Sequence, residues 1–367
     1  MNEQKLDTLL LENNLGESLR GLSLSNTTMR QIPWSVCQLS NLQVLVVSDN
    51  RLTGFENTCF TNMTSLTHIY AERNLITKLH DGVFDGLNSL ISLNLRRNRI
   101  SDIGLHVFSN RSNLWKLQYI DLKHNLLTSL QDGVFDCLQS LNYLDLSANR
   151  ISDIGLHVFS NRSDLLNLSS IDLTDNLLPS LQDGIFDGLK SIYNLNLGGN
   201  RISGIGLNVF SNHSNLWNLS SINLQGNLLT SLQGGLFDGL ESLGHLYLSG
   251  NRISDIDLSV FSNRSNLRNL KYIEFNANLL TSLQDGIFDG LNSLYILDLS
   301  RNLISGIGLN VFSNRSNLSN LSSINLKGNL LTSLQGGLFD GLESLGQLDL
   351  SENRISDIDL SVFFQSI

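Results

Sequence analysis

The chain has 367 residues, of which 41% are hydrophobic, and it carries a formal net charge of −10 at pH 7. This acidic balance disfavours nonspecific binding to phosphates, so we expect no nucleic-acid partner. No apolar run approaches the roughly 20 residues that a membrane-crossing helix needs, so we expect no membrane span in this chain.

One motif, Leu-x-x-Leu-x-Leu-x-x-Asn, recurs along the whole chain. From the third copy onward the spacing alternates, with 24 residues from Asn74 to Asn98 and 27 from Asn98 to Asn125, so the underlying unit has 51 residues. A degenerate copy ends at Thr27, and the others end at Asn14, Asn50, Asn74, Asn98, Asn125, Asn149, Asn176, Asn200, Asn227, Asn251, Asn278, Asn302, Asn329 and Asn353. Repeats of this period predict a solenoid whose turns bury their apolar faces against their neighbours.

Each turn is predicted to contain a short strand and a return segment. In Leu93-Asn94-Leu95 the leucines should point inward and Asn94 outward, as strand alternation requires. Asn98 ends this strand, and its amide can bond backbone groups of adjacent turns that would otherwise be buried without partners. Stacked turns should therefore carry a ladder of such asparagines.

The return segments carry one phenylalanine per turn, which we interpret as core packing. These residues are Phe60, Phe84, Phe108, Phe135, Phe159, Phe186, Phe210, Phe237, Phe261, Phe288, Phe312, Phe339 and Phe363. The three extra residues of the longer turns fall on the outer return side, within 109–112 in the first of them. Because the return segments are longer than the strands, the coil should curve, with parallel strands on its concave face.

These motifs resemble the leucine-rich repeat family, in particular the 24-residue type with Phe in the return segment that occurs in Toll-like receptor ectodomains. The resemblance covers about residues 6–363. It implies an α/β solenoid, a curved horseshoe of about fifteen turns, formed as a single domain over 1–367 with degenerate turns at 1–30 and an incomplete last turn at 355–367. It also implies a receptor-like, non-catalytic role of the kind used in innate immunity.

The ends and the cysteines bear on the compartment. Neither end shows a capping module or a signal peptide, so we expect a fragment of a longer protein. Cys37 and Cys59 lie 22 residues apart in adjacent turns, which permits a disulfide, but Cys37 occupies a position where a buried leucine is expected. The pairing therefore stays open. Cys137 stands where sister turns have glycine, as at Gly86, and is interpreted as a tolerated substitution.

Candidate glycan acceptors in Asn-x-Ser/Thr favour an extracellular or cell-surface protein, and solvated loops of a cytoplasmic protein are the alternative. Two groups of these acceptors, one beginning at Asn110 and the other at Asn167, are each one acceptor copied with the 51-residue repeat. The total number of acceptors therefore overstates the evidence for glycosylation. The acceptors are Asn26, Asn62, Asn110, Asn161, Asn167, Asn212, Asn218, Asn263, Asn314, Asn317 and Asn320.

No constellation for catalysis stands out. The histidines show no metal-ligand spacing with cysteine or clustered carboxylates, and no glycine-rich phosphate loop with a lysine occurs. The recurrent Asp beside Gly, as in Asp85-Gly86, is interpreted as turn chemistry. We therefore expect no enzyme activity, no cofactor and no metal site.

Ligand contacts are expected at strand positions that flank the inward leucines, where tyrosine and arginine are enriched in binding hot spots. Two near-identical copies, 204–262 and 306–364, differ at seven pairs of positions, four of which lie on the strand or at its edge. Acidic residues, Glu72, Asp121, Asp145 and Glu274, share these strands with the candidates. The candidates are His68, Tyr70, Arg73, Arg96, Arg97, Tyr119, Lys123, His124, Tyr143, His245, Tyr247 and Tyr272.

The predicted function is therefore recognition of a protein ligand, or of a microbial or glycan ligand, on the concave face. The alternative is an adhesive or matrix-type scaffold that self-associates, with a homodimer as its simplest form.

Overall fold

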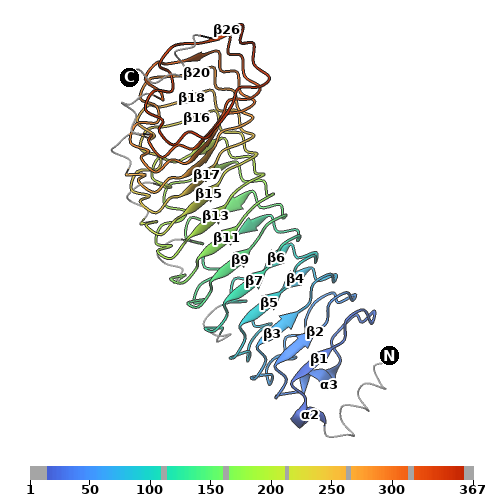
Figure 1. The fold of residues 1–367 in the computed structure, drawn as a ribbon. Coiled ribbons are helices and arrows are strands. Elements are labelled where there is room, and N and C mark those ends of the chain that lie inside the picture. Colours follow the sequence, from blue (N-terminus) through green and yellow to red (C-terminus); the bar gives the residue numbers. More distant parts are fainter. Residues whose placement is uncertain are drawn as a thin grey trace. The chain divides into compact units, whose positions relative to one another are not determined.

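The computed structural model describes residues 15–108, 114–159, 165–210, 215–261, 266–312 and 318–358. The chain divides into two compact units, Met1–Leu177 (unit 1) and Leu178–Ile367 (unit 2), and Figure 1 shows the elements of each. Each unit is a stack of turns in which a three-residue strand pairs in parallel with the strands of neighbouring turns. The predicted parallel-strand solenoid is confirmed.

The described part of unit 1 contains two one-turn helices, α2 (Leu15–Ser18) and α3 (Trp34–Cys37). Its short strands pair on the return side, β4 (Lys78–Leu79) with β6 (Asp102–Ile103) and β8 (Ser129–Leu130) with β10 (Asp153–Ile154). Its long strands are β1 (Gly21–Ser23), β2 (Val44–Val46), β3 (His68–Tyr70), β5 (Ser92–Asn94), β7 (Tyr119–Asp121), β9 (Tyr143–Asp145) and β11 (Ser170–Asp172).

Unit 2 repeats this arrangement. Its long strands are β13 (Asn194–Asn196), β15 (Ser221–Asn223), β17 (His245–Tyr247), β19 (Tyr272–Glu274), β21 (Ile296–Asp298), β23 (Ser323–Asn325) and β25 (Gln347–Asp349). Its short strands are β12 (Ser180–Leu181) with β14 (Gly204–Ile205), β16 (Ser231–Leu232) with β18 (Asp255–Ile256), β20 (Ser282–Leu283) with β22 (Gly306–Ile307), and β24 (Ser333–Leu334) with β26 (Asp357–Ile358).

Within the described residues the strands delimit about thirteen turns, slightly fewer than the fifteen that the sequence predicts for the whole chain. The motif that ends at Asn14 lies outside the described residues, as do Phe363 and most of the last predicted turn. None of the helices in the described part of the chain has the length and apolarity that crossing a bilayer needs.

The core of each unit is built from the residues that the repeat predicts. The middle residue of each long strand from β2 to β23 is buried, as at Leu93, because its side chain points inward. The phenylalanines stack one above the other, with ring centroids 6.1 Å apart for Phe84 and Phe108 and 6.2 Å apart for Phe288 and Phe312. This confirms that the aromatic of each return segment is a packing residue.

The asparagine ladder is also confirmed. The Asn98 Nδ2 donates to the carbonyls of Ala71 (3.0 Å) and Leu95 (2.9 Å), while its Oδ1 accepts from the backbone N–H of Ile76 (3.1 Å). Asn98 is buried, so these bonds satisfy backbone groups that water does not reach. The same pattern repeats in unit 2, for example at Asn251.

A carboxylate accepts a backbone N–H at the same place in successive double repeats. In unit 2 the Asp183 Oδ1 accepts from the backbone N–H of Asn208 (2.9 Å), and a Cβ on Gly206 would lie 2.1 Å from that oxygen. In the next double repeat the two residue types are exchanged. Gly234 replaces the aspartate, and Asp257 replaces the glycine and accepts from the backbone N–H of Ser259 (2.8 Å). A carboxylate therefore occupies this place whichever turn supplies it.

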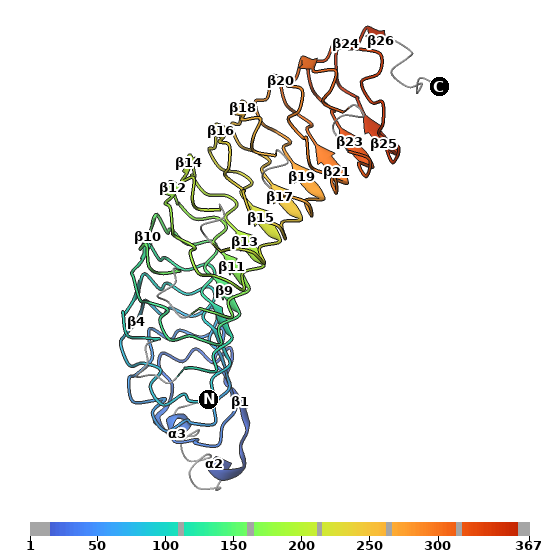
Figure 2. The same ribbon diagram turned by 90° about the vertical axis from the view of Figure 1, so that its left-hand side faces the viewer.

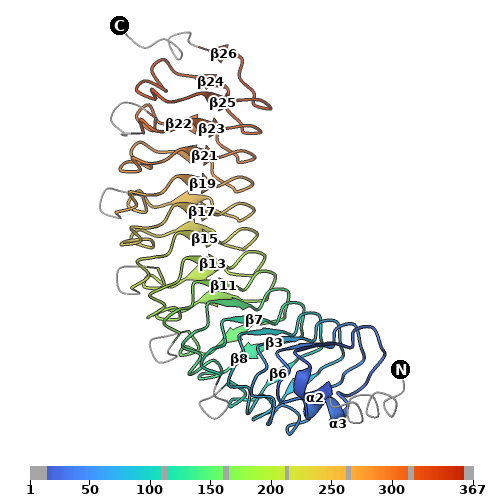
Figure 3. The same cartoon turned by 60° about the horizontal axis from the view of Figure 1, so that its bottom comes forward.

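The long strands of each unit lie along one side and the short strands along the other, as Figure 2 shows, and Figure 3 shows the turns of each unit stacked on one another. We number each turn from the first residue of its long strand. Positions one, three and five face outward, as Ser92, Asn94 and Arg96 do, position six has a left-handed backbone, and position seven is the ladder asparagine. The strand face is the surface formed by positions one, three, five and six.

Candidate functional site

The strand face of unit 1 gathers aromatic side chains from neighbouring strands. Tyr119 on β7 and Tyr143 on β9 are opposite one another in the sheet register, and their rings stack 4.9 Å apart and 4° from parallel. Burial, followed by the carboxylates of Asp121 and Asp145, raises the pKa of Tyr119 to about 12. Burial, followed by the Asp145 carboxylate, also raises the pKa of Tyr143. Both phenols therefore stay protonated near neutral pH and can donate hydrogen bonds to a ligand.

Two buried carboxylates lie at position three of the same strands. The Asp121 Oδ1 accepts from the backbone N–H of Lys123 (2.9 Å), and the Asp145 Oδ1 accepts from the N–H and the hydroxyl of Ser147. Burial raises the pKa of Asp121, and the neighbouring Asp145 raises it further. The sequence places both residues on the outward face of their strands, and their recurrence at one position is typical of a strand-end turn.

Cationic side chains lie beside the tyrosines, at positions five and six of β5 and β7. Arg97 and His124 both have left-handed backbones, with φ of 55° and 54°. Burial lowers the pKa of His124, and the positive charges of Arg97, Arg96 and Lys123 lower it further. Within the residues that the structure describes, Arg97 and Lys123 form no salt bridge.

We call Arg96, Arg97, Tyr119, Lys123, His124 and Tyr143 the unit 1 patch. The other predicted contacts of this unit lie at or beyond its edge. His68 and Tyr70 stack on β3 with ring centroids 6.1 Å apart. Arg73 is already engaged, because its Nη2 donates to the Asp49 Oδ2 at 2.9 Å.

The remaining predicted contacts form a separate cluster in unit 2. His245 on β17 and Tyr272 on β19 are register partners whose rings lie 4.6 Å apart and 5° from parallel. The rings of His245 and Tyr247 lie 6.2 Å apart. Tyr295, which the sequence prediction missed, meets Tyr272 edge to face at 6.3 Å. It precedes its strand by one residue, so the alternation rule did not select it.

The described candidate glycan acceptors fall into two kinds. Asn26 and Asn62 are exposed. Asn167, Asn218 and Asn320 are exposed too, but the Nδ2 of each donates at 2.6 Å to a backbone carbonyl of the preceding turn. Asn269 makes the same bond at 2.7 Å without a following Ser or Thr at the acceptor spacing, so the recurrence of this asparagine has a structural cause. Outside the described residues lie Asn110, Asn161, Asn212, Asn263, Asn314 and Asn317.

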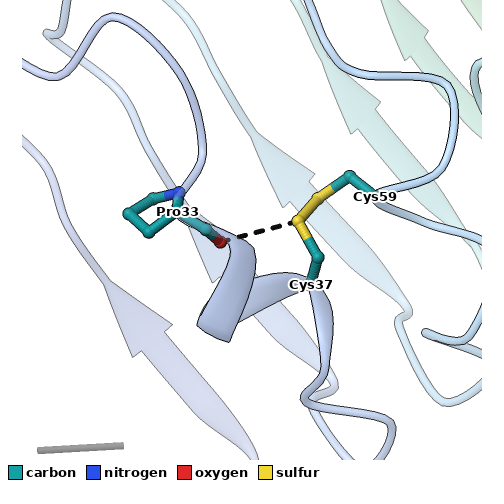
Figure 4. Close-up of a disulfide and its surroundings, with 3 residues drawn as sticks. All are labelled: Pro33, Cys37 and Cys59. Carbon is teal, nitrogen blue, oxygen red and sulfur yellow. Dashed lines mark hydrogen bonds between the residues drawn. A yellow bond between two sulfur atoms is a disulfide. The ribbon is translucent and has the colours of Figure 1, made fainter. Parts of the chain in front are cut away.

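A disulfide joins Cys37 of α3 to Cys59 in the following return segment, with Cα atoms 4.7 Å apart (Figure 4). The pairing that the sequence left open is therefore made. Cys137 is not in a disulfide and has φ 69°, the left-handed backbone that its sister glycines also adopt. Disulfides persist mainly in oxidising compartments.

Stacked parallel strands, an asparagine ladder and an outward face of varied side chains define a repeat protein built around a sheet surface. The model of the BspA type leucine rich repeat region matches residues 30–166 in six copies. The leucine rich repeat model matches 166–220, 217–271, 268–322 and 319–366, which together exceed half of the chain. The chain belongs to the leucine-rich repeat family.

Similar proteins share the fold over most of this length. The chain is 35% identical to Tsukushi of Gallus gallus over 225 residues, 60% of this chain and 56% of that protein, so the match spans little more than half of this relative. A leucine-rich repeat protein of Leptospira interrogans superposes with a TM-score of 0.75 and 27% identity over 94% of this chain and 82% of that one.

A further solved structure is that of a complex. It is the leucine-rich repeat ectodomain of the Arabidopsis thaliana membrane receptor kinase GASSHO1/SCHENGEN3 in complex with CASPARIAN STRIP INTEGRITY FACTOR 2. It is similar to this chain with a TM-score of 0.64 and 26% identity, over 88% of this chain and 37% of that one.

Proposed function

We propose that this chain is a non-catalytic recognition module that binds a protein ligand through the unit 1 patch. The observation that carries the proposal is the group of cations beside the stacked tyrosines, where Arg97 and Lys123 lack an ion-pair partner in the described residues. Tyrosine and arginine are the side chains most enriched in binding hot spots. An anionic segment with hydrogen-bond acceptors for the phenols would match this chemistry.

The strained backbone at Arg97 supports the same proposal. A residue other than glycine in the left-handed region is costly and is often retained for function. A glycine there would relieve the strain, yet Arg97 and His124 keep long side chains on the strand face. Glycan or microbial ligands and a self-associating scaffold stay predictions of the sequence.

An extracellular location is part of the proposal. It is supported by the Cys37–Cys59 disulfide and by the likeness to a membrane-receptor ectodomain. We expect glycans at Asn26 and Asn62 before Asn167, Asn218 and Asn320, because the latter three amides already donate to backbone carbonyls.

The proposal is tested by screening the full chain, displayed as a multimer, against arrayed extracellular proteins and glycans. Each ligand found is then measured against the variants Arg97→Gly and Lys123→Gln. We expect Arg97→Gly to weaken a protein ligand about thirtyfold, the size of a hot spot of ~2 kcal/mol. Arg301→Gly in unit 2 is the matched control, because Arg301 has the same φ of 55° and loses the same charge. Ligands that ignore both unit 1 variants would disprove the assignment.

A further inference from the structure

The strand face of unit 2 carries a second group of aromatic side chains that the proposed function does not use. On β17 and β19, the rings of His245 and Tyr272 stack face to face, and Tyr295 meets the Tyr272 ring at its edge. Tyr247 stands at position three of β17, directly opposite Glu274 on β19. Three tyrosines, a histidine and a carboxylate therefore meet on neighbouring strands.

Position three of β17 and β19 differs from the same position on the other long strands of unit 2. Elsewhere in unit 2 it is held by Asn or Asp, whose oxygen accepts the backbone N–H two residues on, as Asn223 accepts from Gln225 (2.9 Å) and Asp298 from Ser300 (2.9 Å). Tyr247 cannot close this turn, and the longer Glu274 does not: its side chain makes no hydrogen bond within the described residues. The Glu274 carboxylate is thus available to a partner.

The surroundings leave room for a partner backbone. Position six is Gly226 on β15, Gly250 on β17 and Ala277 on β19, so the strip beside Tyr247 and Glu274 carries almost no side chains. On the same face, Ser249 at position five of β17 is 2% exposed, and its hydroxyl has no hydrogen-bond partner among the described residues. A buried hydroxyl without a partner is costly, and a ligand donor or acceptor would satisfy it.

The negative charge of this surface favours a cationic ligand. Burial raises the pKa of Glu274, and the adjacent Asp298 carboxylate raises it further. A bound cation would offset both effects, and cations are also attracted to the faces of tyrosine rings. Neither Glu274 nor Asp298 forms a salt bridge within the described residues.

We propose that β17, β19 and β21 form a binding site for a lysine-bearing segment of a partner protein, with a lysine ammonium on Glu274 and against the neighbouring tyrosine rings. The site goes beyond the proposed function, because it lies in the other unit and selects a ligand of opposite charge. The near-identical copy at β25 lacks this site, because Gln347 and Asp349 stand there in place of His245 and Tyr247.

The test uses the full chain and a fluorescein-labelled Gly-Ser peptide that contains four lysines, with fluorescence anisotropy at physiological salt. We expect Glu274→Gln to weaken binding at least tenfold. Glu274→Asp should weaken it as much although the charge is kept, because the shorter carboxylate would turn to the backbone N–H, as Asp298 does. His245→Gln, which the β25 copy shows the scaffold accepts, should weaken binding severalfold.

Asp255→Asn is the matched control, since Asp255 is an exposed acid on the short strand β18 and should change binding less than twofold. Equal weakening by Asp255→Asn, or wild-type binding by Glu274→Asp, would mean nonspecific attraction to an acidic protein and would overturn the site. A peptide with no measurable affinity for the wild type would overturn it too. Arg97→Gly should leave this peptide's affinity unchanged, so the outcome is independent of the unit 1 ligand.

Discussion

Units 1 and 2 are built from the same repeat, yet they differ at the left-handed position six. In unit 2 four of the seven residues there are glycine: Gly199, Gly226, Gly250 and Gly328. In unit 1 none of the seven is glycine, and the position holds Asn26, Asp49, Arg73, Arg97, His124, Ala148 and Asp175. A side chain in this backbone region costs roughly 1–2 kcal/mol. Unit 1 therefore keeps side chains on its strand face at a conformational cost that unit 2 mostly avoids.

The duplicated copies within unit 2 show that some differences on the face compensate each other. Gln225 and Gly250 in one copy correspond to Lys327 and Glu352 in the other. The Lys327 Nζ lies 3.1 Å from the Glu352 Oε1, so two of the four strand-face differences form one ion pair. Divergence on this face therefore includes local structural exchange, and only the unpaired differences, His245/Gln347 and Tyr247/Asp349, point to recognition.

We expect the largest effect from removing a ladder asparagine, and comparing the two units shows whether the ladder stabilises both equally. Asn98→Ala in unit 1 and Asn251→Ala in unit 2 should each lower the free energy of unfolding by roughly 3 kcal/mol, since each leaves one buried N–H unpaired and removes further hydrogen bonds. Urea denaturation measures this, with the half-buried Asn94→Ala as control, expected to cost under ~1 kcal/mol. Clearly unequal losses would show that the ladder differs between the units.

The next effect concerns the exchange of Asp and Gly between turns. Gly206→Asp should destabilise unit 2 by about 2 kcal/mol, because its Cβ would lie 2.1 Å from the Asp183 Oδ1. The double variant Asp183→Gly with Gly206→Asp should regain most of the loss, since Gly234 and Asp257 already hold that arrangement. A double-mutant cycle measures the coupling. Simple additivity of the two substitutions would refute the exchange.

A smaller effect addresses the position-six comparison itself. Arg97→Gly should raise the free energy of unfolding by up to ~1 kcal/mol, and Gly226→Arg should lower it by ~1–2 kcal/mol. A Cβ on Gly226 would meet no atom closer than 3.6 Å, so the loss would be conformational. Shifts in the denaturation midpoint give both values. If Arg97→Gly instead destabilised the chain, the Arg97 side chain would contribute to stability, and its left-handed backbone would no longer support a role in binding.

The smallest effect is a dependence on pH that only unit 1 should show at this position. The pKa of His124 is lowered by burial and by Arg97, so protonation favours the unfolded chain. Its contribution to stability should be complete above about pH 7 and fall as the pH drops through the unfolded value of about 6.5. His124→Asn, which suits the left-handed backbone, should flatten thermal stability between pH 7.5 and 5.5. Arg97→Gly should reduce this pH dependence in part. If thermal stability changed equally with pH in the wild type and both variants, the pH dependence could not be assigned to His124.

Much of the fold was predictable because the information is local and repeated. The inward leucines, the stacked phenylalanines and the bonds of Asn98 follow from a pattern in which each turn meets only its neighbours. The outward placement of Tyr119 and Lys123 follows from strand alternation for the same reason. The expected count of about fifteen turns includes the motif that ends at Asn14, which lies outside the described residues.

The sequence alone determined the period, the parallel strands and the residues that face outward, since these depend on spacing along the chain. Tertiary structure decided which outward side chains pair with another residue of the chain and which can contact a ligand. Arg73 is held by Asp49 whereas Arg97 has no such partner in the described residues, Cys37 reaches Cys59, and Tyr119 stacks on Tyr143. Such contacts depend on distance and direction between side chains of different turns, which spacing constrains but does not specify.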